Sequence, residues 1–128
     1  MERILACCKL YISESRNALS LESIEQATKF YPEVVTVNKF KDEEYNRVGY
    51  TLVSRLYMQT KADAEPLRKA VFDMVREAFR TIDLQLHSGT HPRLGVVDHI
   101  CFHPLSLASL NQVAGLAESL ADDIGRKL

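Results

Sequence analysis

Hydrophobic and polar residues recur along the 128-residue chain in patterns that predict four strands. The segments 4–12, 34–37, 47–58 and 96–103 are rich in β-branched and apolar residues, which favour extended backbone. The third segment alternates over most of its length. A polar connection at residues 41–44 separates the second segment from the third. We therefore expect those two strands to form a hairpin.

Three further segments, within residues 13–32, 63–82 and 104–124, carry apolar residues at the three- and four-residue spacing of amphipathic helices. Ser13 and Ser15 offer hydroxyls for the N-cap of the first helix. The expected core-facing residues are Ala18, Leu21, Ile24, Ala27, Thr28 and Tyr31 in the first helix, Leu67, Val71, Met74, Val75, Ala78 and Ile82 in the second, and Leu110, Val113, Ala114, Ala117, Leu120 and Ile124 in the third.

The order strand, helix, strand, strand, helix, strand, helix predicts an α+β fold of the ferredoxin-like βαββαβ type. Such a fold has an antiparallel sheet with its helices on one face, here with an extra C-terminal helix. A length of 128 residues suits one core, so residues 1–128 are expected to form a single domain. The second face of the sheet is open in this arrangement. We expect a homodimer contact or a second subdomain to cover it.

Composition excludes several classes of function. The formal net charge is -1, with 16 basic and 17 acidic residues, so neither nucleic acid nor an anionic membrane is an expected partner. Three cysteines make no disulfide framework, and their odd number indicates a reducing compartment. The sequence also offers no apolar segment long enough for a signal peptide or a membrane span. These features together predict a cytoplasmic protein.

Candidate chemistry gathers in residues 87–104, which hold all four histidines of the chain. Within this stretch, His91 lies between the helix-breaking residues Gly89 and Pro92, in an expected loop that leads into the strand at 96–103. A histidine on an anchored loop suits a general base, because its pKa lies near neutrality. The alternative interpretation is a loop histidine that only caps a backbone group.

Residues 87–98 read His-Ser-Gly-Thr-His-Pro-Arg-Leu-Gly-Val-Val-Asp and resemble a pattern of the formiminotransferase family, His-x-Gly-Glu-His-Pro-Arg-Met-Gly-Ala-Leu-Asp. Two other segments are also similar to that family. Residues 46–53, Asn-Arg-Val-Gly-Tyr-Thr-Leu-Val, resemble its Asn-Arg-Thr-Val-Tyr-Thr-Phe-Val strand, and residues 13–17, Ser-Glu-Ser-Arg-Asn, resemble the Ser-Glu-Gly-Arg-Asn that opens its first helix. The resemblance covers the N-terminal subdomain of the family's formiminotransferase domain.

The resemblance implies transfer of a formimino group from formiminoglutamate to tetrahydrofolate, which is the co-substrate. By the same resemblance His91 is the general base that takes the proton from the attacking folate nitrogen. Arg93 and Arg47 are the expected partners of the substrate and folate carboxylates, because a guanidinium binds a carboxylate through two hydrogen bonds. The expected folate- and substrate-binding set is completed by Asn46, Gly95 and Asp98.

Two departures from the family pattern leave a second interpretation open. Thr90 stands where the family usually has glutamate, and Asn38-Lys39-Phe40 stands where it carries an acidic Asp-x-Asp. In the family, the substrate tunnel lies between this subdomain and a second one of similar fold. The second interpretation is therefore a catalytically inactive relative that acts as a folate-binding or protein-interaction module.

A third interpretation is a zinc-binding structural module. His99, Cys101 and His103 alternate along the expected strand at 96–103 and so project from one face. Two imidazoles and a thiol suit tetrahedral zinc if a fourth ligand comes from elsewhere. The spacing of about 6.5 Å between neighbours on one strand face is wide for a shared ion, so no metal is expected.

Overall fold

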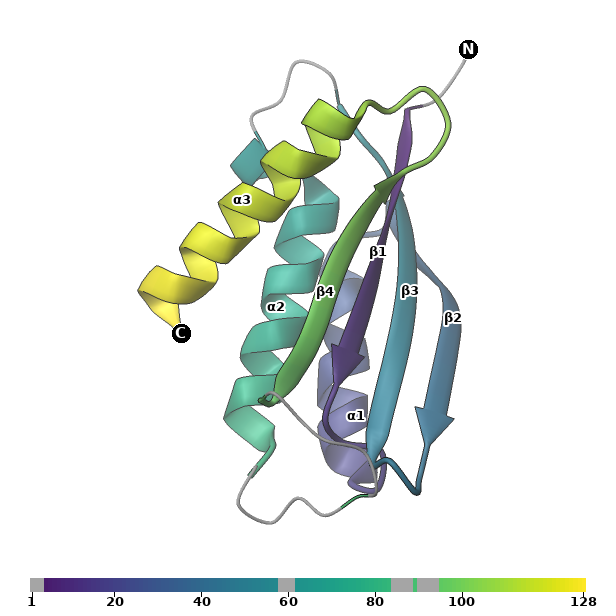
Figure 1. The fold of residues 1–128 in the computed structure, drawn as a ribbon, viewed down its shortest axis with the longest axis vertical. Helices are drawn as coiled ribbons and strands as arrows, with labels where there is room; N and C mark the ends of the chain where they lie inside the picture. The colour runs from purple at the N-terminus through teal and green to yellow at the C-terminus, as the bar shows by residue number, and fades with distance from the viewer. Residues whose placement is uncertain (1–3, 58–61, 84–88, 90–94) are drawn as a thin grey trace.

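The computed structural model of the chain describes residues 4–57, 62–83, 89 and 95–128. Its helices and strands follow the expected order (Figure 1). The elements are β1 (Leu5–Ile12), α1 (Ala18–Gln26), the 3-10 turn η1 (Ala27–Phe30), β2 (Val34–Asp42), β3 (Arg47–Arg55), the 3-10 turn η2 (Ala62–Ala64), α2 (Pro66–Thr81), β4 (Val97–Pro104) and α3 (Leu110–Lys127).

The four strands form one sheet in the order β2-β3-β1-β4, and every neighbouring pair is antiparallel. Helices α1 and α2 lie side by side on one face of this sheet, while α3 lies beyond them next to β4 (Figure 1). The predicted ferredoxin-like α+β fold with an extra C-terminal helix is therefore confirmed. The described elements leave the second face of the sheet open.

The core lies between the sheet and α1 and α2, because alternate strand residues point towards the helices. In β1 these residues are Ala6, Cys8, Leu10 and Ile12, each fully buried. The predicted stripe on α2 is also confirmed, since all six of its residues are buried. Strand β2 extends from Val34 to Asp42, beyond the predicted 34–37, because its polar half pairs with β3 across the hairpin.

The first helix begins later than predicted, because its N-cap is Asn17 instead of Ser13 or Ser15. The Asn17 side chain accepts a hydrogen bond from the Ser20 N–H at 3.1 Å. The two earlier hydroxyls donate to carbonyl oxygens of other segments, Ser13 to Gly95 and Ser15 to Asp42. These hydroxyls therefore join separate parts of the chain.

The buried face of α3 differs from the prediction. The helix starts at Leu110, after a capping box between Ser109 and Gln112, and not near residues 104–106. Leu110 is 74% exposed, whereas Leu116 and Asp123 are buried. The prediction was right for Val113 and Leu120, which are buried, but it included Leu110, which lies in the exposed first turn, and missed Leu116 and Asp123.

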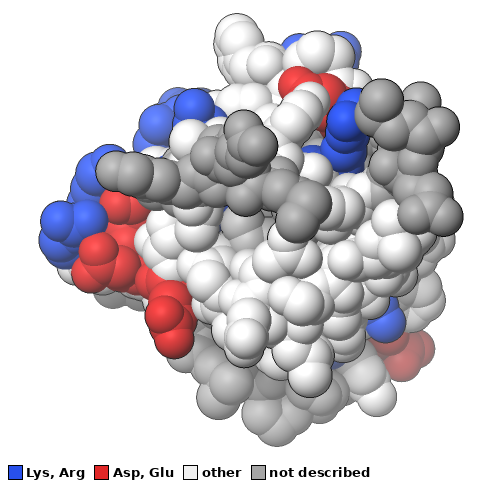
Figure 2. All heavy atoms as spheres, turned by 90° about the horizontal axis from the view of Figure 1, so that it is seen from above, with Lys and Arg blue, Asp and Glu red and all other residues white. Residues whose placement is uncertain are grey.

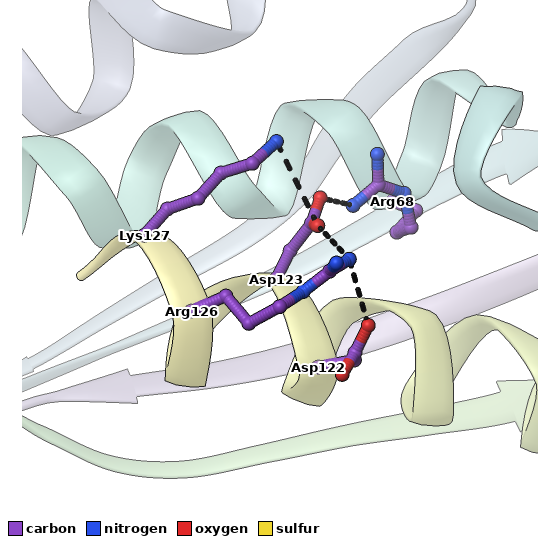
Figure 3. Close-up of polar contacts among 5 residues, drawn as sticks. All are labelled: Arg68, Asp122, Asp123, Arg126 and Lys127. Carbon is purple, nitrogen blue, oxygen red and sulfur yellow. Dashed lines mark hydrogen bonds and ion pairs between the residues drawn. The ribbon is translucent and has the colours of Figure 1, made fainter.

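Asp123 of α3 forms a buried ion pair with Arg68 of α2 (Figure 3). Its Oδ2 lies 2.6 Å from Arg68 Nη1, and both residues are almost completely buried. Two cations of the same helix, Arg126 and Lys127, approach its other oxygen at 3.5 and 3.7 Å. The hydrogen bond from Arg68 holds the pKa of Asp123 below its usual value.

This ion pair predicts a pH-dependent contribution to stability. A carboxyl group whose pKa is lower in the folded chain stabilises the fold above its unfolded pKa of about 4, and that contribution is lost as the pH falls through the folded-state value. Asp123→Asn is therefore expected to unfold more readily than the wild type in urea at pH 7, with the difference shrinking below about pH 4.

Asp122→Asn is the matched control for this prediction, since its side chain is 63% exposed one residue earlier on α3. It is expected to change the urea midpoint little at either pH. Equal midpoints for the wild type and Asp123→Asn at pH 7 would show that the pair does not hold α3 against α2.

The end of the molecule that carries the β4–α3 connection is largely uncharged at its surface (Figure 2). Leu105, Leu107 and Leu110 are all exposed there. Leu107 has a φ of 60°, in the left-handed region that a branched side chain rarely adopts.

No helix among the described residues is long and apolar enough to cross a bilayer.

Candidate functional site

In the predicted loop, the structure describes the two glycines Gly89 and Gly95. Both lie against other segments of the candidate site. A Cβ placed on Gly89 would lie 2.4 Å from the carbonyl oxygen of Tyr45, in the β2–β3 turn. The predicted base His91 and the predicted carboxylate ligand Arg93 lie outside the described residues. Gly89 therefore fixes one boundary of the predicted loop beside the hairpin that also carries Asn46.

Gly95 marks the other boundary of that loop and contacts the β1–α1 connection. Its carbonyl oxygen accepts a hydrogen bond from the Ser13 hydroxyl at 2.7 Å, and the next carbonyl, that of Val96, accepts one from the Ser13 N–H at 2.8 Å. Asp98 accepts a longer bond of 3.4 Å from the Gly95 N–H. The structure thus gives Asp98 a turn-stabilising contact.

Asn46 ties the β2–β3 turn to the β1–α1 connection. The residue is buried and has a φ of 55°, a conformation that asparagine tolerates better than most residues. Its side-chain oxygen accepts a hydrogen bond from the Ser15 N–H at 2.8 Å. Arg16 strengthens the same junction by donating from Nε and Nη2 to the carbonyl oxygen of Glu43, at 3.1 and 2.6 Å.

Arg47 lies on the open face of the sheet, at this same end. Its guanidinium carbon is 5.0 Å from the centre of the Tyr11 ring on the neighbouring strand β1. Gly49 faces that ring, and a Cβ there would approach the ring to 2.8 Å. The ring of His99 on β4 lies 6.0 Å from the Tyr11 ring on the other side. The missing side chain of Gly49 therefore lets an aromatic ring lie flat beside Arg47.

Strand alternation places more cations than anions on the open face. Lys9 of β1 and Arg55 of β3 are exposed on it, and Arg47 is half-buried. Among the described strand residues on this face, the only acidic one is Asp42, at the end of β2. A face with this charge pattern favours ligands that carry carboxylates.

The alternate residues of strand β3, Val48, Tyr50 and Leu52, point to the core. Tyr50 is buried, and its hydroxyl donates a 2.8 Å hydrogen bond to Glu25 of α1. Burial raises the pKa of Tyr50 above its ordinary value, and the hydrogen bond to Glu25 acts in the same direction. Glu25 also pairs with Lys39 at 2.7 Å, so the Lys39 side chain lies on the helix-covered face of the sheet. These groups stabilise the fold away from the open face.

The candidate zinc residues do not gather around a common point. His99, Cys101 and His103 share a strand face, as predicted, and the only contact among them is Cys101 Sγ to His103 Nε2 at 3.3 Å. Over residues 4–57, 62–83, 89 and 95–128, no three His, Cys, Asp or Glu residues are close enough to hold a metal ion. The described structure therefore does not support the zinc interpretation.

Sequence reasoning missed Lys9, Tyr11 and Ser13 as members of this end of the sheet. The apolar residues of segment 4–12 predicted a strand, but they did not show which residues lie on which face of the sheet. Strand pairing supplies that information, because Tyr11 pairs with Gly49 of β3 on one side and with His99 of β4 on the other.

Comparison with known proteins points to the same family that the three segments meeting here resemble. Residues 5–128 match the family described as formiminotransferase domain, N-terminal subdomain. The chain is 56% identical over 125 residues to the formiminotransferase cyclodeaminase-like protein of Arabidopsis thaliana. It is 27% identical over 128 residues to glutamate formimidoyltransferase of Streptococcus pyogenes serotype M1, and 24% identical over 128 residues to formimidoyltransferase-cyclodeaminase of Sus scrofa.

The chain spans only part of each relative. The alignments cover 98% of this chain but 41% of the Arabidopsis protein, and 100% of this chain but 40% of the Streptococcus protein. For the pig protein, the alignment covers 100% of this chain and 22% of the relative.

Proposed function

The chain belongs to the formiminotransferase family, whose N-terminal subdomain it matches, and from this we propose that it binds a reduced folate and takes part in formimino transfer. The observation that carries the proposal is the meeting of segments 13–17 and 46–53 with the glycines of segment 87–98 at one end of the open face. These are the three segments whose sequences resemble the family.

The charge of the open face supports a ligand of this class. Formiminoglutamate and the glutamate tail of a folate both present carboxylates. Arg47 lies at the meeting point of the three segments, Lys9 and Arg55 lie further along the face, and the sequence adds Arg93 in the loop. We propose that Arg47 and Arg93 bind carboxylates through charged hydrogen bonds. The Arg47 guanidinium lies over the Tyr11 ring, which helps to fix its position on the face.

We propose that His91 is the general base of the transfer, taking a proton from the folate nitrogen as that nitrogen attacks the formimino carbon. The resemblance supports this role, because His91 is the histidine of the His-Pro-Arg sequence that this chain shares with the family. Gly95 closes the loop, while Asn46 and Asp98 act as positioning residues through the turns that they hold.

A second candidate function, that of a binding module without turnover, is favoured by β2. This strand exposes Val35, Val37 and Phe40, and Asn38 pairs with Thr51 where the family carries a carboxylate. Exposed apolar residues on a sheet are typical of contact with another domain. We propose that a second subdomain of similar fold, or a second copy of the chain, covers the β2 side of this face, at the opposite edge of the sheet from β4.

Isothermal titration with a reduced folate tests the binding proposal. Arg47→Gln is expected to weaken binding by roughly tenfold or more, because a hydrogen bond to a charged group is worth about 1.5–3 kcal/mol. Arg76→Gln is the matched control, since Arg76 is a half-exposed arginine on α2. Equal dissociation constants for the wild type and Arg47→Gln would remove Arg47 from the site. Binding without formimino transfer would select the second candidate.

A further inference from the structure

Cys101, in the middle of β4, belongs to a thiol–imidazole pair. Its Sγ lies 3.3 Å from His103 Nε2, which is hydrogen-bonding distance for sulfur. Cys101 is only partly buried, and β4 is an edge strand of the described sheet. The pair therefore combines a nucleophile, a base in contact with it and access from solvent.

The surroundings of Cys101 on the open face are basic. Lys9 lies directly opposite on β1 and is exposed, while His99 and His103 flank Cys101 on β4. The two diagonal neighbours on β1 are the Cys7 thiol and the Tyr11 ring. Among the described residues of β1 and β4, none that faces Cys101 is acidic. A neighbouring cation stabilises a thiolate and attracts an anionic reagent.

The other two cysteines are poor competitors for the same reagent. Cys7 and Cys8 are buried, and burial raises the pKa of both thiols. A buried thiol with a raised pKa stays protonated and reacts slowly. The chain thus contains an internal comparison, with one accessible cysteine beside a base and two buried ones.

We propose that Cys101 is a site of reversible mixed-disulfide formation with small-molecule disulfides that carry carboxylates. His103 Nε2 takes the proton of the thiol, and the Cys101 sulfur attacks one sulfur of the reagent. A new S–S bond forms as the old one breaks, and the leaving sulfur departs with the electron pair and takes the proton from His103. Cys101 is oxidised, and half of the reagent is reduced to a thiol.

Glutathione disulfide is the test reagent, and intact mass followed by peptide mapping measures the adduct on the folded chain. We expect one glutathionyl group, on Cys101, and no adduct in Cys101→Ser. His103→Gln is expected to lower the initial rate about threefold or more, because the base is lost. His99→Gln, which alters the other flanking histidine, is the matched control and is expected to keep at least most of the rate.

A second comparison tests the role of charge. Cystamine, a cationic disulfide, is expected to react more slowly than glutathione disulfide with the wild type, and Lys9→Gln is expected to narrow that difference. Thermal melting of each variant checks that the fold is retained. An adduct on Cys7 or Cys8 instead of Cys101, or equal rates for the wild type and a folded His103→Gln variant, would overturn the proposal. Neither readout depends on folate binding.

Discussion

Replacing His91 with alanine is expected to slow formimino transfer by about a hundredfold to ten-thousandfold, the usual contribution of a positioned general base. The physical reason is that the attacking folate nitrogen must lose a proton as its bond to the formimino carbon forms. The assay uses formiminoglutamate and tetrahydrofolate as substrates and follows release of glutamate.

Two controls make the result of His91→Ala specific. His87→Ala removes another histidine of the same segment and is expected to leave the rate within about twofold. Folate affinity is expected to survive in His91→Ala, because the base acts on the reacting nitrogen and not on the carboxylates. An unchanged rate in His91→Ala would remove this residue as the base. A wild-type protein without transfer activity would contradict the transferase part of the proposal.

Gly89→Ala is expected to destabilise the chain by about 1–3 kcal/mol and to weaken folate binding, since overpacking against backbone forces that backbone to shift. The new Cβ would lie 2.4 Å from the Tyr45 carbonyl oxygen and 3.2 Å from that of Glu44. A backbone carbonyl cannot rotate away as a flexible side chain does. The shift would therefore move the β2–β3 turn, which also carries Asn46 and Arg47.

Urea unfolding and folate titration together measure the effect of Gly89→Ala. Gly125→Ala is the matched control, because a Cβ there meets nothing within 4 Å and alanine favours a helix by up to about 1 kcal/mol. If Gly89→Ala kept both the stability and the affinity of the wild type, the contact between Gly89 and the turn would have no part in the site.

The strand and helix order was predictable because each strand is rich in β-branched or apolar residues and each helix carries a periodic apolar stripe. The buried stripe of α2 followed directly from three- and four-residue spacing. The limits of β2 were less predictable, because its polar half is extended only through pairing with β3. Tertiary pairing thus decided an element that local propensity left as a connection.

The errors in the helices have a common physical cause, which is competition for polar groups. Ser13 and Ser15 looked like N-caps, but carbonyl oxygens distant in the sequence take their hydroxyls, and Asn17 caps α1. In α3, Asp123 is buried because Arg68 of α2 pairs with it. A local pattern identifies neither partner, since each pair joins residues far apart in the chain.

The segments that form the candidate site were predictable, but the place in the fold where they meet was not. Resemblance singled out the ends of the loop, Gly89 and Gly95, together with Arg47, yet only the sheet register shows that Tyr11 and Lys9 face the same side. The net charge of the whole chain is only -1 and gives no sign of a cationic face. The charge of the open face can be recognised only from that register.

Amide chemical-shift mapping of the labelled chain during titration with a reduced folate tests the central claim most directly. The account predicts that the largest shifts belong to Tyr11, Arg47 and Gly49, at one end of the open face, and that residues of α2 and α3 stay nearly unchanged. Shifts centred on α2 and α3, or no shifts at saturating folate, would contradict the assignment of this face as the folate site.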